Sequence, residues 1–439
     1  MPDLLRPQYR VPSMGEIAAL PPNGRRVLST FSGCGGSCLG YRMAGYKVIW
    51  ANEFVPAAQD VYRANHPDSI LSTADIRTLD GATVLAEAGL SEGELDLFDG
   101  SPPCASFSTA GKREKGWGET KKYSDTEQRS DDLFFEYIRL LRALRPKVFV
   151  AENVSGLVKG KAKGYFKQIL AEMKASGYRV EARLLNAKWL GVPQNRERLI
   201  FVGVRNDLVS TYGVGPAFPD PLPYTYSIRD AIPHLTALEG GRSANFEQKG
   251  APLDVDRAIP TIGAGSKGNG SHQFYVTGVS TSKGIRSLDE PSPTILTHGR
   301  EGTQSELVLA GVAGDGTFTD PETGDTISLG NAVGREWDRL NEGEQSERYF
   351  QLVRPHRDNA VGTVTASGGN VGLASVTHPT EKRKFTLGEL RRLSGFPDDF
   401  ALSGTYSQRW ERLGRAVPPV MAAAVGRSIF DHILSRLPE

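Results

Sequence analysis

The sequence predicts an α/β protein with a mostly parallel sheet and a second, smaller domain rich in strands and loops. Strand-like apolar runs alternate with helical stretches through the first half of the chain, which is the pattern of strand–helix–strand units with right-handed crossovers. The pattern changes between residues 236 and 384, because that stretch holds 22 of the 49 glycines and few helical periods. The predicted parts are an N-terminal arm (1–25), a catalytic domain (26–235), the glycine-rich domain (236–384) and helices that return to the catalytic domain (385–439).

Short apolar runs predict strands, and amphipathic or small-residue runs predict helices. The strands are expected at residues 26–31, 47–51, 96–99, 147–151 and 199–204. The helices are expected at residues 56–64, 131–144, 165–176 and 418–430. Pro56 suits a first helical turn, and Thr386 lies three residues before Glu389, which is a capping-box signature.

Composition excludes several classes of protein. The chain has 439 residues, 39% hydrophobic and 23% charged, with a net charge of +1, so any nucleic-acid binding has to come from local patches. Its three cysteines build no disulfide framework and have no zinc-knuckle partners nearby, so no metal site is expected. No run approaches the roughly 18 apolar residues of a membrane span. We expect a soluble, cytoplasmic protein.

Two features of the glycine-rich domain have no assigned chemistry. Residues 311–347 carry nine acidic and two basic side chains, which favours a solvated insertion that faces away from any polyanion. Three short segments resemble one another, at residues 257–262, 290–295 and 359–364. They represent either a weak repeat of hairpin–loop units or a chance similarity of turn chemistry.

A glycine loop after the first strand suggests a nucleoside-binding site. Residues 31–36 read Phe-Ser-Gly-Cys-Gly-Gly between a strand and a helix, where backbone N–H groups can approach a ligand closely. Glu53 follows Gly33 by 20 residues and can accept hydrogen bonds from ribose hydroxyls. Cys38 stands where a dinucleotide fingerprint needs glycine, which argues against nicotinamide. The alternative is a set of tight-turn glycines beside surface acids.

A second group of residues suggests a reaction centre. Cys104 follows Pro102 and Pro103 at the end of a predicted strand, and the two prolines fix a rigid corner. Glu152 ends the neighbouring predicted strand, so the thiol and the carboxyl should share a cleft. This pair suits attack on an electron-poor ring with protonation of a ring nitrogen, which requires a desolvated, protonated Glu152.

Arg196 and Arg198 lie two residues apart, so on an extended strand both would point to one side. Their guanidinium groups suit a carbonyl oxygen or a phosphate. The alternatives are a buried core thiol, an exposed glutamate and a solvated edge strand.

Six ordered motifs make the chain resemble the DNA (cytosine-5) methyltransferase family, of the bacterial restriction–modification type. They are Phe-Ser-Gly-Cys-Gly-Gly (31–36), Pro-Pro-Cys (102–104), Glu-Asn-Val (152–154), Gln-Asn-Arg-Glu-Arg (194–198), Arg-Leu-Ser-Gly-Phe-Pro (392–397) and Gly-Arg-Ala-Val-Pro-Pro (414–419). The resemblance covers residues 25–235 and 383–437. It implies a Rossmann-like mixed sheet of the S-adenosylmethionine-dependent methyltransferases, with residues 236–384 as the target-recognition domain.

The resemblance also implies a role for each site residue. Cys104 would attack C6 of a flipped-out cytosine, Glu152 would hold and protonate N3, and Arg196 and Arg198 would secure the base and a nearby phosphate. S-adenosylmethionine would lie on the glycine loop, with Glu53 at the ribose and Asp75 with Ile76 at the adenine. The full set implied for the cofactor is Phe31, Gly33, Gly35, Gly36, Glu53, Phe54, Asp75, Ile76, Pro103, Leu133 and Arg415. Residues 105–130 resemble the mobile catalytic loop of the family.

The implied substrate is double-stranded DNA with one cytosine flipped out, acted on by a monomer. A cognate restriction endonuclease would be encoded separately. Candidate base-reading loops are residues 263–271, 297–304 and 367–372. The alternatives are a tRNA cytosine-5 methyltransferase, a catalytically silent nucleic-acid-binding scaffold and a nicotinamide oxidoreductase. The chain departs from the usual family pattern at Ser29, Ser101, Ala105 and Arg415.

Overall fold

The computed structural model describes most of the two halves of the chain that flank the glycine-rich segment. Its described residues are 6–103, 121–123, 126–128, 133–158, 162–232, 235, 280–281, 284–285, 311–312 and 317–438. Cys104, most of the predicted catalytic loop, two of the three similar segments and the candidate base-reading loops 263–271 and 297–304 lie outside them.

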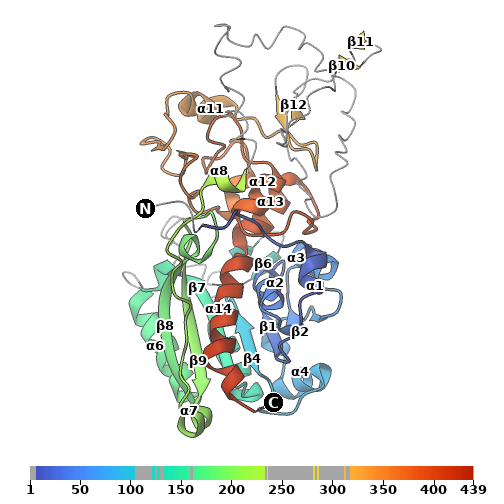
Figure 1. Ribbon diagram of the computed structural model, residues 1–439, viewed down its shortest axis with the longest axis vertical. Helices are drawn as coiled ribbons and strands as arrows, with labels where there is room; N and C mark the ends of the chain where they lie inside the picture. Colours follow the sequence, from blue (N-terminus) through green and yellow to red (C-terminus); the bar gives the residue numbers. More distant parts are fainter. Residues whose placement is uncertain are drawn as a thin grey trace, which may run out of the picture.

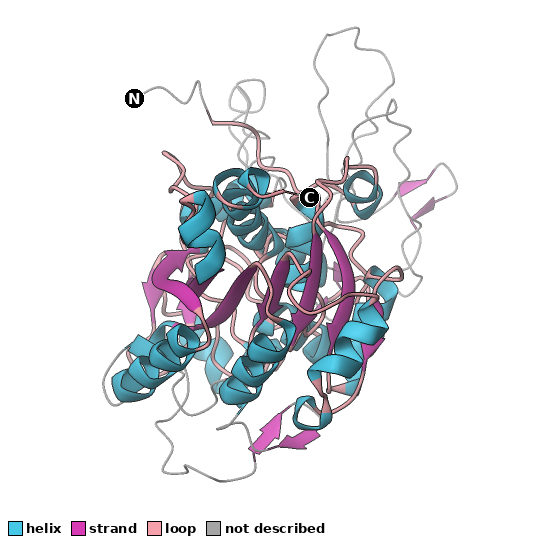
Figure 2. Ribbon diagram, turned by 90° about the horizontal axis from the view of Figure 1, so that it is seen from below, coloured by secondary structure: helices cyan, strands magenta, loops and turns pink. Residues whose placement is uncertain are grey.

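A seven-stranded sheet forms the centre of the molecule, with helices on both sides (Figure 2). The strand order is β3-β2-β1-β4-β7-β9-β8. The strands are β1 (Arg26–Thr30), β2 (Lys47–Asn52), β3 (Ile70–Ser72), β4 (Leu97–Gly100), β7 (Val148–Val154), β8 (Tyr178–Asn186) and β9 (Glu197–Arg205). Neighbours pair in parallel from β3 to β7, whereas β9 is antiparallel to both β7 and β8. The predicted α/β class and mostly parallel sheet are confirmed, and β8 is a strand that the sequence patterns did not predict.

Two apolar layers hold the helices against the sheet, because successive side chains of a strand point to opposite faces. The helices are α2 (Gly36–Met43), α3 (Pro56–Asn65), α4 (Gly81–Ala88), α5 (Leu133–Leu144), α6 (Lys163–Ala175), α7 (Asn206–Tyr212) and α14 (Pro419–His432). On one face, Leu28 and Phe98 pack in the same core as α4, α5 and α6. On the other face, Val27 and Leu97 pack with α2 and α14.

The C-terminal helix α14 runs across the sheet beside α2 (Figure 1). A glycine makes this close crossing possible, since a Cβ on Gly40 would lie 2.5 Å from the Pro419 carbonyl oxygen and 2.5 Å from the Ala422 Cβ. The last helix of the chain is therefore part of the sheet domain.

A third apolar core joins the sheet domain to the rest of the chain. It gathers Ile17 of the N-terminal arm with Ile228, Val364, Phe385 and Trp410. The helices at this junction are α1 (Met14–Ala18), α8 (Ile228–Ala231), α12 (Leu387–Leu393) and α13 (Tyr406–Arg415). Arg6 of the arm pairs with Asp230, with Nη2 2.8 Å from Oδ1, so the arm lies against the end of the predicted catalytic domain.

The described part of the glycine-rich domain has a small core of its own. Helix α11 (Asn331–Trp337) contributes Val333 and Trp337, which pack with Leu329, Leu340 and Leu352.

The short strands outside the central sheet are β5 (Lys121–Tyr123), β6 (Thr126–Gln128), β10 (Ser280–Thr281), β11 (Gly284–Ile285), β12 (Gly311–Val312), β13 (Phe318–Thr319), β14 (Glu344–Gln345) and β15 (Val353–Arg354). They form four antiparallel pairs.

The prediction that residues 311–347 form a solvated insertion is wrong for the part that bears on the C-terminal helices. Asp320 is fully buried and accepts a hydrogen bond from the Leu387 backbone N–H, 2.8 Å away, at the start of α12. Asp325 does the same for Tyr406 at the start of α13, at 2.9 Å, and Glu322 pairs with Arg391. These acids stabilise helix N-termini and a buried arginine, which residue counts alone do not reveal.

In the described part of the chain, no helix has the length and apolar character needed to cross a membrane. Among the same residues, no group of three or more histidine, cysteine or acidic side chains is arranged to hold a metal ion.

Replacing Gly40 with alanine should lower the free energy of unfolding by about 1–3 kcal/mol, because the new methyl group meets backbone and forces α2 and α14 apart. Urea denaturation measures this loss. Gly164→Ala in α6 is the matched control, since a Cβ there would meet nothing within 4 Å. The control should be neutral or stabilising by up to about 1 kcal/mol, and equal behaviour of both variants would contradict the packing described here.

Candidate active site

Two neighbouring parallel strands bring the predicted reaction centre to one edge of the sheet. β4 and β7 pair in register, with Gly100 opposite Ala151. Beyond this pair the chains remain connected, because Asn153 donates from Nδ2 to the Pro102 carbonyl oxygen at 3.1 Å. Pro103 is half-buried, and Cys104 follows it outside the described residues. The described part of the corner, which ends at Pro103, therefore lies beside the segment that contains Glu152.

Glu152 and Arg198 form an ion pair at this edge. Arg198 Nε lies 2.7 Å from Glu152 Oε1, and the two side chains are 13% and 14% exposed. The antiparallel pairing of β7 and β9 places Glu152 opposite Ile200 and Val154 opposite Arg198. Burial lowers the pKa of Arg198, and the charge of Glu152 raises it in turn. A guanidinium group thus holds the carboxyl group of Glu152, and the protonated state expected from the sequence stays a prediction.

Arg196 is buried in a junction with the C-terminal part of the chain. It precedes β9, and the residue is only 2% exposed. Nη1 donates to the Val364 carbonyl oxygen at 3.0 Å, and Nη2 donates to those of Gly414 and Ala416 at 2.9 and 3.0 Å. Burial and the charge of Arg198 lower the pKa of Arg196, and the charge of Glu152 raises it in turn. Arg196 thus joins the sheet domain to residues 364–416, and the expectation that both arginines face the base stays a prediction.

The glycine loop has the backbone conformations that its residues allow. Gly33 and Gly35 have φ values of +56° and +88°, in the left-handed region that favours glycine. A Cβ on Gly36 would lie 2.4 Å from the Val417 carbonyl oxygen, and one on Gly35 would lie 2.2 Å from His66 Nε2. Phe31 also has a positive φ, +53°, which is uncommon outside glycine and costs on the order of 1–3 kcal/mol. Contacts around the loop therefore have to maintain this backbone conformation of Phe31.

Glu53 anchors this loop. It is buried, and its two carboxylate oxygens each accept one backbone N–H at 2.7 Å, from Gly33 and from Val55. Burial raises the pKa of Glu53. Each oxygen keeps a further lone pair that a ribose hydroxyl can use. A left-handed glycine loop at the start of α2 beside a fixed carboxylate fits the nucleoside end of S-adenosylmethionine.

The other residues expected at the cofactor differ in how deeply they are buried. Phe54 and Asp75 are half-buried, whereas Ile76 and Leu133 are buried in the core that contains α5. The Asp75 carboxylate accepts from the Arg77 backbone N–H at 3.0 Å. Arg415 is exposed at the end of α13, where its Nε lies 2.7 Å from Glu411 Oε1. The roles expected for these residues at the cofactor therefore stay predictions.

A buried carboxylate behind the glycine loop is the main site feature that the sequence patterns missed. Asp99 is 2% exposed and lies opposite Ser29 in the β1–β4 pair. Its carboxylate accepts hydrogen bonds from the hydroxyls of Ser29, Ser37 and Tyr41, all at 2.9 Å. The sequence feature that could have indicated it is that Asp99 lies within an otherwise apolar strand.

The other two cysteines are poor nucleophiles. Cys34 and Cys38 are buried, and burial raises the pKa of Cys34 to about 12 and that of Cys38 to about 11. Because the thiolate is the reactive form, neither residue competes with Cys104 as a candidate.

The candidate base-reading loop at residues 367–372 is only partly available. A Cβ on Gly368 or Gly369 would collide with the Trp410 side chain, and both glycines are buried against α13. Asn370 is exposed, so the outer end of the loop is the part that could meet a ligand.

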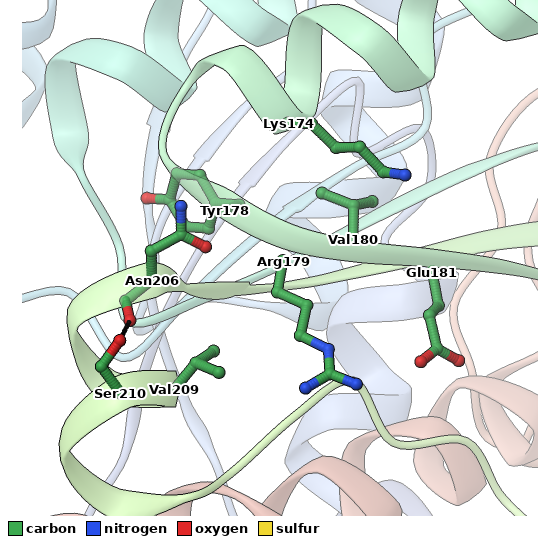
Figure 3. A pocket seen from close by; sticks show the side chains of 8 residues that line it. All are labelled: Lys174, Tyr178, Arg179, Val180, Glu181, Asn206, Val209 and Ser210. Carbon is green, nitrogen blue, oxygen red and sulfur yellow. Dashed lines mark hydrogen bonds between the residues drawn. The ribbon is translucent and has the colours of Figure 1, made fainter.

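A surface cavity of about 560 Å³ lies far along the sheet from this edge. It is lined by β8, α6 and α7, through residues that include Lys174, Arg179, Glu181 and Ser210 (Figure 3). β8 is separated from β4 by β7 and β9. The cavity contains none of the predicted site residues.

Known proteins share the sequence and the fold. The profile of the C-5 cytosine-specific DNA methylase family matches residues 25–431. The type II methyltransferase M.NgoFVII of Neisseria gonorrhoeae is 28% identical over 407 residues, which cover 93% of this chain and 87% of that relative. M.FnuDI of Fusobacterium nucleatum is 38% identical over 201 residues, covering 45% and 51% of the two chains. A putative DNA modification methyltransferase from an E. coli prophage has the same fold, with a TM-score of 0.57 and 21% identity over 94% of this chain and all of that one.

The profile match spans nearly the whole chain, and the curated relatives are methyltransferases of restriction–modification systems. The chain therefore belongs to the C-5 cytosine-specific DNA methylase family, and it is a DNA (cytosine-5) methyltransferase that uses S-adenosylmethionine as its methyl donor.

Proposed function

We propose that the chain methylates C5 of a cytosine rotated out of duplex DNA, through a covalent bond between Cys104 Sγ and C6. C6 of a stacked cytosine is out of reach of any side chain, so the base has to leave the duplex. The proposal is supported by the placement of Glu152, Arg198 and the Pro102–Pro103 segment at one edge of the sheet, beside the glycine loop.

The proposed reaction begins when the Cys104 thiolate forms a bond to C6 of the rotated cytosine. The electron pair of the C5–C6 double bond moves into the C4–C5 bond, the C4–N3 pair moves onto N3, and N3 takes a proton from Glu152. The donor, when bound, would supply an electrophilic methyl group to C5 and keep the electron pair of the broken bond to sulfur. Loss of the C5 proton to a base reforms the C5–C6 double bond as the Cys104 thiolate leaves C6, and N3 returns its proton to Glu152.

The ion pair between Arg198 and Glu152 is the observation that carries this proposal. A guanidinium group fixed at 2.7 Å from the carboxylate orients Glu152 and leaves other N–H donors of Arg198 for a base carbonyl such as O2 of cytosine. Glu152 would take up its proton when the base displaces part of this contact and excludes water. Arg196 has a separate role, because its Nη1 and Nη2 groups donate to three backbone carbonyls that join the sheet domain to residues 364–416.

The proposed substrate is a duplex and not a tRNA. The curated relatives that align over most of this chain are methyltransferases of restriction–modification systems. Reading a duplex sequence also requires a sizeable module that contacts the grooves, and residues 236–384 offer one. We therefore propose that these residues select the site.

A DNA duplex in which cytosine is replaced by 5-fluorocytosine should trap the protein covalently when S-adenosylmethionine is present. Fluorine takes the place of the C5 proton, so the final elimination cannot occur. Because the recognition sequence has not been assigned, a long amplified duplex carries the substitution. Denaturing electrophoresis should show a shifted band, and peptide mapping should place the adduct on Cys104.

Cys104→Ser and an unsubstituted duplex are the controls, and neither should give a stable adduct. An adduct on Cys34 or Cys38, or methylation of normal DNA without any adduct on the fluorinated duplex, would contradict the proposed nucleophile.

Substitution of the two arginines should separate chemistry from folding. Arg198→Lys should lower kcat/KM at least about tenfold, because a planar fork is replaced by a point charge, and should barely change the urea midpoint. Arg196→Lys should lower the free energy of unfolding by about 2–3 kcal/mol, since buried carbonyls lose their donors. The reverse assignment of effects would show that Arg196 is the residue that holds the base.

A further inference from the structure

The Asp99 carboxylate is held directly behind the glycine loop, and no salt bridge to it forms within the part of the chain that the structure describes. Within the described residues, its hydrogen-bond partners are three hydroxyls, those of Ser29, Ser37 and Tyr41. Buried carboxylates are normally paired with a cation because burial of an isolated charge is costly. Asp96, three residues earlier on the same segment, follows that rule and lies 2.8 Å from Lys147 Nζ and 3.2 Å from Arg25 Nη1. Asp99 therefore places negative charge in the protein interior that no cation among the described residues pairs with.

The hydroxyl partners fix where this charge acts. Ser29 precedes the loop at the end of β1, and Ser37 follows it in the first turn of α2. Ser32, within the loop, donates to the Ser29 hydroxyl oxygen at 3.1 Å. Asp99 is thus connected to both ends and to the interior of the loop at residues 31–36. Glu53, the second buried carboxylate at the loop, adds to the same negative potential.

We infer that Asp99 is a positioning residue that provides fixed negative charge beneath the glycine loop, and that this charge makes the site prefer the sulfonium cation of S-adenosylmethionine over the uncharged thioether of the demethylated product. The inference rests on the placement of the donor on this loop proposed above. The two ligands differ in one methyl group and one positive charge, so a nearby fixed charge is the physical means of telling them apart.

The charge state of Asp99 can be tested in the accessible pH range. Burial raises its pKa to about 6, against the opposing hydrogen bonds from Tyr41, Ser37 and Ser29. Asp99 is therefore ionised at pH 7 and becomes neutral as the pH falls through about 6.

Cys38 and Tyr41 of α2 and Tyr137 of α5, which surround Asp99, have pKa values that burial raises further above neutrality, so they stay uncharged below pH 7. Two other carboxyl groups bear on the same region. The charge of Glu152, which is paired with Arg198, contributes to raising the pKa of Asp99, and burial raises the pKa of Glu53 at the loop. Asp99→Asn keeps both of these groups, so any pH dependence that the variant retains comes from them and not from Asp99.

Isothermal titration calorimetry of the full chain with S-adenosylmethionine and with S-adenosylhomocysteine at pH 7 tests the inference. Asp99→Asn keeps the shape and removes the charge. We expect the affinity for S-adenosylmethionine to fall about fivefold relative to the affinity for S-adenosylhomocysteine. This is the size of effect expected when one unit charge is removed at a distance where solvent partly screens it. Ser32→Ala is the matched control, because it removes a hydrogen bond within the loop and leaves all three hydroxyl partners of Asp99 in place. It should weaken both ligands by the same factor.

A second measurement follows the pH dependence of binding to the wild-type protein, so it remains informative even if a variant fails to fold. The wild-type preference for the sulfonium ligand should decrease between pH 7 and pH 5, and more steeply than the preference of Asp99→Asn. Equal weakening of both ligands in Asp99→Asn, or a wild-type preference that is independent of pH, overturns the inference and leaves the proposed function standing. Wild-type protein that binds neither ligand would instead refute the proposed cofactor site.

Discussion

The in-register parallel pairing of β1, β4 and β7 is the constraint on which the rest of the site depends. It places Thr30, Gly100 and Ala151 side by side, so that the segments that follow all leave the sheet at one edge. The glycine loop, the Pro102–Pro103 corner and Glu152 are those segments. A slip of one residue in either pairing would turn alternate side chains to the opposite face of the sheet and separate the groups that the chemistry requires.

Two buried charged residues stabilise this arrangement in different ways. Arg196 joins the sheet domain to backbone carbonyls of residues 364–416, and Asp99 joins the two ends of the glycine loop. Each makes at least three hydrogen bonds through its charged group, which lowers the cost of burying a charge. The junction that Arg196 holds lies between the predicted cofactor site and the domain that we propose selects DNA.

Much of the fold could be predicted from local patterns. The strands near residues 26, 47, 96, 147 and 199 and the helix of residues 418–430 are all present. The direction of β9 could not be predicted, because alternation of apolar residues is the same for either direction of a strand. β8 was missed because it is an edge strand whose exposed positions carry charges such as Arg179 and Glu181, the usual protection of a sheet edge.

The site was predictable where chemistry follows from residue type and spacing, and less so where it depends on contacts distant in sequence. The backbone partners of the Arg196 side chain lie at least 168 residues away, so spacing within its own segment cannot predict that it joins two parts of the chain. Asp320 belongs to an acidic segment that residue counts place at the surface, although it is buried against the start of α12. In both cases a charged residue is placed by a hydrogen-bond partner distant in sequence.

Bisulfite sequencing of a plasmid from cells that express this chain tests the central claim most directly. The account predicts 5-methylcytosine at one fixed sequence context with the wild-type chain, and none above background with Glu152→Ala or Cys104→Ala. Methylation that persists in the Cys104→Ala variant would contradict it, as would a methyl group on an exocyclic nitrogen instead of C5.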